Sequence, residues 1–165
     1  MNIPKIELVP VKRLHKLALK SGVSQLQELL GTTIPEGWPQ FPEAFDVHDE
    51  DTEASELWPS YFFVCPEGAL VGNGGFAAPP NETGEVEIGY EIAPAYQNNG
   101  YATAAASALV EIALSRHGVS SVVAHTLAQE NASNSVLRKV GMSLVAELPN
   151  PEVGKVWKWS IPRST

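Results

Sequence analysis

A polar hexapeptide, Gln97-Asn98-Asn99-Gly100-Tyr101-Ala102, connects a strand-like segment to an alanine-rich, helix-like segment. The first turn of a helix has backbone N–H groups without partners and a partial positive charge, so it can bind a phosphate or diphosphate without lysine or arginine. Gly100 would let the backbone come close to such a ligand, and no Asp or Glu occurs between residues 97 and 110. The loop is therefore predicted to bind an anion. An ordinary strand-to-helix turn is the alternative, because Gly and Asn also tolerate unusual backbone angles.

Three carboxylates, Glu85, Glu87 and Glu91, lie in the strand-like segment just before this loop, at spacings of two and four positions. In a regular strand such side chains point to the same face. A carboxylate placed there could act as a general base. The alternative is a solvated strand face on which the carboxylates have no chemical role.

The predicted elements place the loop between a strand and a long helix. The strand spans residues 85–92 and is followed by Pro94, which has no N–H to donate. The helix runs toward Arg116, and Gly118 beyond it is a typical stop signal. Periodicity and turn residues predict the other elements: a strand at 6–9, two amphipathic helices within 11–30 that are interrupted at Ser21-Gly22, strands at 61–65 and 69–77, a strand at 119–127, a helix over about 133–140 with Gly141 past its end, and two strands in the last twenty-odd residues.

Composition favours one compact domain without disulfides. The chain has 165 residues, enough for a single domain with a hydrophobic core, and its one cysteine excludes disulfide scaffolds and cysteine-rich metal sites. The formal charge of −8 argues against a nucleic-acid binder and would suit a cationic substrate. No apolar run approaches a membrane span, and the start MNIPKIELVP lacks the basic and apolar regions of a secretory signal. We therefore expect a cytoplasmic protein without a membrane partner.

The loop has the form Q-x-x-G-x-A, which resembles the acyl-CoA pyrophosphate loop of the GNAT acetyltransferase superfamily. Residues 119–142 and 150–162 resemble the fifth strand, the following helix and the end of the C-terminal hairpin of the ribosomal-protein N-terminal acetyltransferase-like (RimJ/RimL-type) subgroup. The resemblance implies an α/β (α+β) fold in a single domain over residues 1–165. This GNAT fold would have a mixed, mostly antiparallel sheet of about six or seven strands, splayed between the fourth and fifth, with about four flanking helices.

The resemblance also implies an activity, which is N-acetyl transfer from the co-substrate acetyl-CoA directly to a primary amine in a ternary complex. The acceptor would be a peptide, such as a protein N-terminus, or a small molecule; nucleic acid, membrane and metal are not implied. A monomer or a homodimer would be compatible with this activity. The alternative is a non-catalytic CoA-binding or regulatory module of the same fold.

The same resemblance implies roles for individual residues. Pantetheine would bond to the backbone near Ile92 and Ala93, and Glu87 would be the base, with Glu91, Glu85 or a water molecule as alternatives. The residues implied to bind the pyrophosphate are Gln97, Asn98, Asn99, Gly100, Tyr101, Ala102 and Thr103.

Two further contacts are implied at the start of the helix after the fifth strand. Ser133 would contact the CoA sulfur as the catalytic acid, and either Asn131 or Asn134 would reach the pantetheine. Simple N-capping is the structural alternative for these residues, because Asn and Ser satisfy unpartnered N–H groups at any helix start.

Other conspicuous residues have structural interpretations that are at least as strong. The acid-rich stretch at residues 46–56 is expected to be a solvated loop or, alternatively, a contact for a cationic substrate. Cys65 and the lone His125 are interpreted as structural. Four aromatic residues that flank the acid-rich stretch either line the acceptor site or belong to the core: Trp38, Phe41, Phe45 and Trp58.

Overall fold

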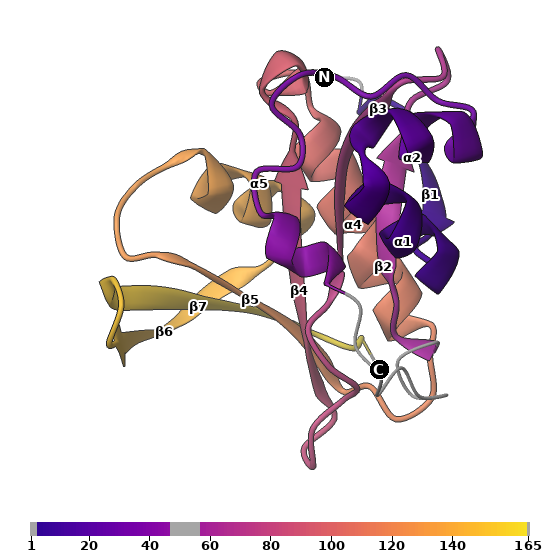
Figure 1. Cartoon of the computed structure of the whole chain (residues 1–165). Coiled ribbons are helices and arrows are strands. Elements are labelled where there is room, and N and C mark those ends of the chain that lie inside the picture. Colours follow the sequence, from indigo (N-terminus) through magenta and orange to yellow (C-terminus); the bar gives the residue numbers. More distant parts are fainter. Residues whose placement is uncertain (1–2, 47–56, 165) are drawn as a thin grey trace. The chain divides into compact units, whose positions relative to one another are not determined.

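The computed structural model describes residues 3–46 and 57–164 (Figure 1). In chain order, the elements within these ranges are β1 (Glu7–Pro10), α1 (Arg13–Ser21), α2 (Val23–Leu30), the short helix η1 (Pro42–Phe45), β2 (Ser60–Val64), β3 (Leu70–Phe76), β4 (Glu85–Ile92), the short helix η2 (Pro94–Tyr96), α4 (Tyr101–Leu114), β5 (Ser121–Leu127), α5 (Ala132–Val140), β6 (Ser143–Asn150) and β7 (Gly154–Pro162).

The strands and α-helices follow the predicted order, with boundaries that differ only slightly from those expected, whereas the short helices η1 and η2 were not predicted. β4 has the predicted bounds, and α1 and α2 are separate helices because Gly22 has a φ of 145°, which other residues rarely adopt. α4 begins at Tyr101, directly after Gly100. β5 begins later than predicted, since Ser120 donates its N–H to the carbonyl of Gly84 at 2.8 Å instead of joining the strand.

Within the described residues, seven strands hydrogen bond in the order β1-β2-β3-β4-β5-β7-β6. The β4–β5 ladder is parallel, whereas the β1–β2, β2–β3, β5–β7 and β6–β7 ladders are antiparallel. The parallel ladder runs only from Glu85 opposite Ser121 to Glu87 opposite Val123, although β4 continues to Ile92. The predicted α/β fold is confirmed: a mixed sheet in which the fourth and fifth strands pair over only part of their length.

Contacts within the chain group into two compact units. The first unit comprises residues 1–75 and 90–105, and the second comprises residues 76–89 and 106–165. Three elements, β3, β4 and α4, contribute residues to both units, because a boundary between the units falls within each of them. The prediction of one domain over residues 1–165 stays a prediction.

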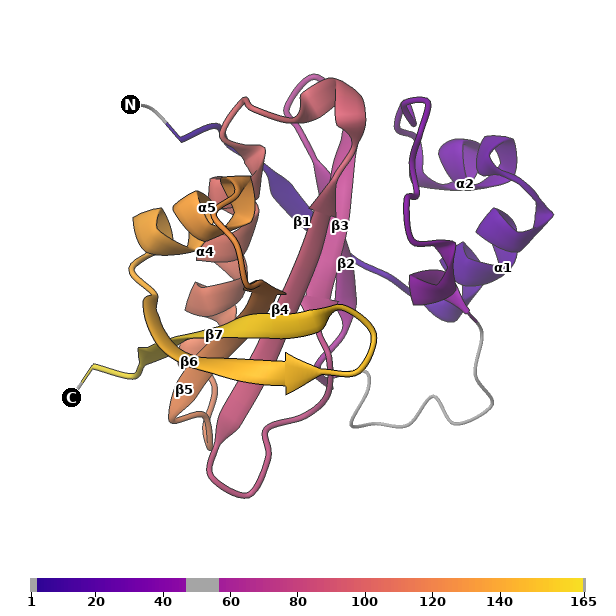
Figure 2. The same ribbon diagram turned by 90° about the vertical axis from the view of Figure 1, so that its left-hand side faces the viewer.

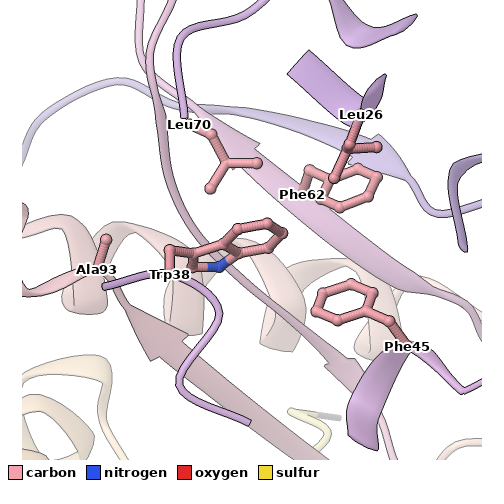
Figure 3. Close-up of a cluster of buried hydrophobic side chains, with 6 residues drawn as sticks. All are labelled: Leu26, Trp38, Phe45, Phe62, Leu70 and Ala93. Atoms are coloured by element: carbon pink, nitrogen blue, oxygen red, sulfur yellow. The ribbon is translucent and has the colours of Figure 1, made fainter. Parts of the chain in front are cut away.

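The first unit has a core built on aromatic side chains, and its α1 and α2 lie side by side (Figures 1 and 2). The buried members of this core are Leu26, Trp38, Phe45, Phe62, Leu70 and Ala93 (Figure 3). The ring of Phe62 stacks on Phe45, with 5.8 Å between centroids, and meets Trp38 at a steep angle. Trp38 also donates its indole N–H to Oδ1 of the buried Asn73 at 2.8 Å. Trp38 and Phe45 are therefore core residues, whereas Phe41 is 56% exposed.

In the second unit, β6 and β7 form an antiparallel hairpin, drawn in orange and yellow in Figure 2. Trp159 on β7 is buried and donates its indole N–H to Oγ1 of Thr126 on β5 at 3.0 Å. Thr126 in turn donates to Oδ1 of the fully buried Asn134 on α5 at 2.6 Å. This chain of hydrogen bonds ties α5 to the sheet and orients Thr126 and Asn134.

No helix in the ranges 3–46 and 57–164 is long and apolar enough to cross a membrane. The same ranges contain no group of three or more His, Cys, Asp or Glu side chains that could hold a metal ion. Of the acid-rich stretch at residues 46–56, only Asp46 lies within the described residues. Cys65 is free and buried, in agreement with its structural interpretation.

Candidate active site

In the first unit, the predicted anion-binding loop leads into α4, whose first turn contains no acidic residue. Ala104 donates its N–H to the carbonyl of Gly100 at 3.0 Å, and the helical ladder begins there. The N–H groups of Tyr101, Ala102 and Thr103 therefore precede the ladder and need partners from outside the helix. A row of such groups, with the helix dipole behind it, is able to bind a diphosphate.

Two amide side chains hold the backbone of this loop. Gln97 donates from Nε2 to the carbonyl of Ile92 at 3.1 Å, and Asn99 donates from Nδ2 to the carbonyl of Gln97 at 2.9 Å. Asn98 has a φ of 64° and Gly100 a φ of 85°, so the chain passes through two left-handed residues before the helix begins. The side-chain amides of Gln97 and Asn99 each have a second N–H group that could reach a ligand.

Gly100 is needed for the shape of the loop as well as for ligand access. Its φ lies in the region that residues with a Cβ atom rarely adopt, and a Cβ atom built there would lie 2.9 Å from Cδ of Pro4. A substitution at Gly100 would therefore disturb the backbone and the N-terminal segment whether or not a ligand binds. Ala102, half-buried in the first turn of α4, is a better position at which to test ligand binding.

The end of β4, where pantetheine is expected to bond, already makes several hydrogen bonds. Ala93 donates its N–H to the carbonyl of Val71 on β3 at 2.8 Å and accepts the N–H of Tyr96 at 2.9 Å. Successive residues of a strand direct their N–H and C=O groups to opposite edges, so the backbone groups of Ile92 point away from β3. Of the two residues, Ile92 is thus the one whose peptide groups lie on the edge of β4 that β3 does not occupy.

Glu91 is a buried carboxylate in the first unit, with 8% of its surface exposed. Its Oε2 accepts the backbone N–H of Gln40 at 3.0 Å, and its Oε1 is buried without a hydrogen-bond partner among residues 3–46 and 57–164. Burial raises the pKa of Glu91; the N–H groups of Gln40 and Phe41 oppose this rise, and the charge of Glu43 adds to it.

This environment predicts that a Glu91→Gln variant gains stability relative to the wild type as the pH rises. Because the folded-state pKa of Glu91 is raised, its carboxyl favours folding most below the ordinary value of 4.5, and this contribution is lost as the pH rises through the folded-state pKa. Glutamine is neutral throughout, so the difference in unfolding free energy should shift toward the variant between acidic and neutral pH. Urea unfolding of both proteins at several pH values measures this difference, and a pH-independent difference would contradict the prediction.

In the second unit, the other two carboxylates of β4 have partners on neighbouring strands. Both oxygens of Glu85 accept hydrogen bonds from Nζ of Lys158 on β7, at 3.0 and 3.1 Å. Oε2 of Glu87 lies 2.8 Å from Nδ1 of His125 on β5. The three glutamates, which the spacing predicts to lie on one face of the strand, therefore have three different environments.

At the start of α5, also in the second unit, Asn131, Ser133 and Asn134 have different roles in the structure. Asn131 is the N-cap, since its Oδ1 accepts the N–H of Asn134 at 3.1 Å. The Asn134 side chain accepts from Thr126 and donates to the carbonyl of Gln129, so its amide is used inside the protein. Ser133 is exposed in the first turn of the helix and does not cap it.

Each unit thus brings part of the predicted site together. The first holds the pyrophosphate loop with Ile92 and Glu91, and the second holds Glu87 and the residues at the start of α5. The sequence did not reveal that His125 is the partner of Glu87. Glu87 pairs with Val123 on β5, and His125 lies two residues after Val123 on the same face of that strand. Nor did the sequence reveal the contact of Gln40 with Glu91, for which no sequence signal exists because the backbone of Gln40 makes it.

Comparison with known sequences identifies a family. Residues 30–143 match the family described as "Acetyltransferase (GNAT) domain". A protein of Bacillus subtilis (strain 168), named "Uncharacterized N-acetyltransferase YjdG", is 36% identical over 145 residues, which are 87% of this chain and 83% of that protein.

Solved structures of two acetyltransferases have a similar fold. RimL, a ribosomal L7/L12 alpha-N-protein acetyltransferase in complex with coenzyme A, aligns with a TM-score of 0.71 at 20% identity, covering 95% of this chain and 93% of RimL. Spermidine N-acetyltransferase from Vibrio cholerae, in complex with CoA and spermine, aligns with a TM-score of 0.69 at 12% identity, covering 96% of this chain and 95% of that one. At these identities the likeness concerns the fold.

Proposed function

Because the chain belongs to the GNAT acetyltransferase family and is accordingly an acyltransferase, we propose that it transfers the acetyl group of acetyl-CoA directly to a primary amine in a ternary complex. The observation that carries this proposal is the start of α4. There the N–H groups of Tyr101, Ala102 and Thr103 precede the helical ladder, behind a loop of the form Q-x-x-G-x-A. A site of this kind suits the diphosphate of CoA.

The donor would be bound mainly through main-chain groups. In the first unit, the N–H groups at the start of α4 would bind the diphosphate, assisted by the amides of residues 97–99. The pantetheine arm would bond to the peptide groups near Ile92 and Ala93, with Ile92 favoured by the direction of its backbone. In the second unit, Asn131 is favoured over Asn134 as a further pantetheine contact, because the amide of Asn134 is used internally.

The reaction needs one proton removed from the acceptor and one supplied to the departing thiolate. An ammonium has no lone pair with which to attack a thioester, so a basic group must first deprotonate it. Glu87 is proposed for this step, since Lys158 already holds both oxygens of Glu85 and the backbone of Gln40 engages Glu91. The partner of Glu87, His125, is itself a basic side chain. The exposed hydroxyl of Ser133 is proposed as the group that protonates the CoA sulfur.

The acceptor is proposed to be a protein N-terminus or a small amine. The similar structures are named for acceptors of these two kinds, a ribosomal protein's N-terminus and spermidine. Both present a primary amine that is cationic at neutral pH. The formal charge of −8 on this chain would favour the approach of such a cation.

An Ala102→Asp substitution tests the proposed donor site without disturbing the fold. A carboxylate in the first turn is favourable for the helix itself, but it would occupy and repel the site of the diphosphate. We expect acetyl-CoA to bind at least about tenfold more weakly, a loss of about 1.4 kcal/mol, with the melting temperature unchanged or slightly raised. Isothermal titration calorimetry measures the affinity.

Ala102→Asn is the matched control, because its amide has the size of the carboxylate without the charge, and it should lose much less affinity for acetyl-CoA than Ala102→Asp does. An Ala102→Asp protein with wild-type affinity would place the diphosphate elsewhere and remove the main support for the proposed function.

A further inference from the structure

His125 and Glu87 form a carboxylate–imidazole pair on the sheet of the second unit. Nδ1 of His125 lies 2.8 Å from Oε2 of Glu87, and the two side chains are 30% and 42% exposed. An ionised carboxylate can only accept a hydrogen bond, so the neutral imidazole facing it carries its proton on Nδ1. Nε2 then has a free lone pair, and it has no hydrogen-bond partner in the described part of the chain.

The strand register explains why the carboxylate of Glu87 contacts His125. Glu87 pairs with Val123 on β5, and His125 lies two residues further along the same face. Lys158 stands directly opposite His125 on β7, but its ammonium is bound by both oxygens of Glu85. The charged groups around the imidazole on this face are thus arranged as two pairs, and the carboxylate of Glu87 is left to the histidine.

We propose that Glu87 acts through His125, whose Nε2 takes the proton from the acceptor ammonium. This inference rests on the acetyltransferase function proposed above and changes the role of Glu87 from base to positioning residue. Imidazoles titrate close to neutral pH, whereas carboxylates titrate well below it, so an oriented imidazole is the better proton acceptor for an amine. Glu87 holds the tautomer and stabilises the imidazolium once it forms, in the way that a carboxylate supports the histidine of a hydrolase triad.

The proposed step balances in atoms and charge. One proton moves from the ammonium to Nε2, and the neutral amine attacks the thioester carbon. The C–N bond forms, the C–S bond breaks, and the thiolate of CoA leaves with its electron pair. The hydroxyl of Ser133 gives its proton to that thiolate and takes the second proton of the attacking nitrogen, and the imidazolium releases its proton to water. The products are the acetylated amine, CoA with a free thiol and one proton in solution.

Steady-state kinetics of three variants test the role of His125. His125→Gln should lower kcat on the order of 100-fold or more, while KM for acetyl-CoA stays within about twofold of the wild type. Added imidazole should restore part of the activity of His125→Ala, which a merely structural histidine would not allow. His117→Gln is the matched control, since His117 is an exposed histidine of the same unit, and it should keep the wild-type kcat.

A spectroscopic measurement tests the pair without any acceptor. Long-range proton–nitrogen NMR of the imidazole should show neutral His125 with its proton on Nδ1 in the wild type, and a shift toward the Nε2 proton in Glu87→Gln. A wild-type His125 protonated mainly on Nε2 would overturn the proposal. So would a His125→Gln enzyme with wild-type kcat, which would leave the acetyltransferase function standing. A wild-type protein that binds acetyl-CoA but acetylates no amine would overturn the proposed function and the role of His125 together.

Discussion

Replacing Gly72 with alanine is expected to destabilise the protein by about 3 kcal/mol or more. Gly72 is buried in the middle of β3, and a Cβ atom there would overlap the carbonyl oxygen of Glu91 and lie 3.0 Å from Cα of Ile92. The obstacle is backbone, which cannot rotate away as a side chain could. β3 and the end of β4 would have to move apart, and the bond from the N–H of Ala93 to the carbonyl of Val71 would weaken with them.

Gly89→Ala is the matched control for this substitution. Gly89 is an exposed residue of β4, and a Cβ atom built on it meets no heavy atom within 4 Å. Urea unfolding should therefore give the Gly89→Ala protein a stability close to that of the wild type. Equal stabilities of the Gly72→Ala and Gly89→Ala proteins would contradict the close approach of β3 to β4 on which the position of Ile92 depends.

Truncating Phe62 to alanine is expected to cost about 3–5 kcal/mol of unfolding free energy. Phe62 is fully buried, and its ring contacts Phe45, Trp38 and the ring of His15, with a centroid distance of 5.3 Å to the last. Removing the ring leaves a cavity at the centre of the aromatic core drawn in Figure 3, and the residues around it come from several elements that cannot all close in.

Phe41→Ala removes an equal volume of aromatic side chain from the same unit. Phe41 is 56% exposed, so its loss should change the unfolding free energy by less than about 1 kcal/mol. Thermal and urea unfolding of the two variants measure the contrast. A similar loss in both would show that the aromatic cluster does not form the core of the first unit.

Much of the fold could be predicted from local signals in the sequence. Gly22 separates α1 from α2, Gly141 ends α5 in the left-handed conformation typical of a helix C-terminus, and the alternation of β4 predicted its bounds. These features depend on residues close together in the chain. The composition of the core could not be predicted in this way. Whether Trp38 would line a site or join the core depended on contacts with α2 and β2, which local sequence patterns do not show.

The candidate site was predictable to the extent that it is local. The loop before α4 could be found because its spacing is contiguous, and the capping of α5 by Asn131 follows the usual relation between an N-cap side chain and the N–H three residues on. The three glutamates of β4 could not be ranked, because Lys158, His125 and Gln40 reach them from distant parts of the chain.

We propose that this protein binds acetyl-CoA through the start of α4 and passes the acetyl group to an amine. The most direct test of this proposal is calorimetric titration of the wild type and of Ala102→Asp with acetyl-CoA and 3′-dephospho-CoA, followed by a thiol-release assay on a panel of amines and peptides. We predict that both ligands bind the wild type, since both keep the diphosphate, that Ala102→Asp loses affinity for each, and that one class of amine releases CoA. A folded wild-type protein that binds neither ligand would contradict a donor site at the start of α4.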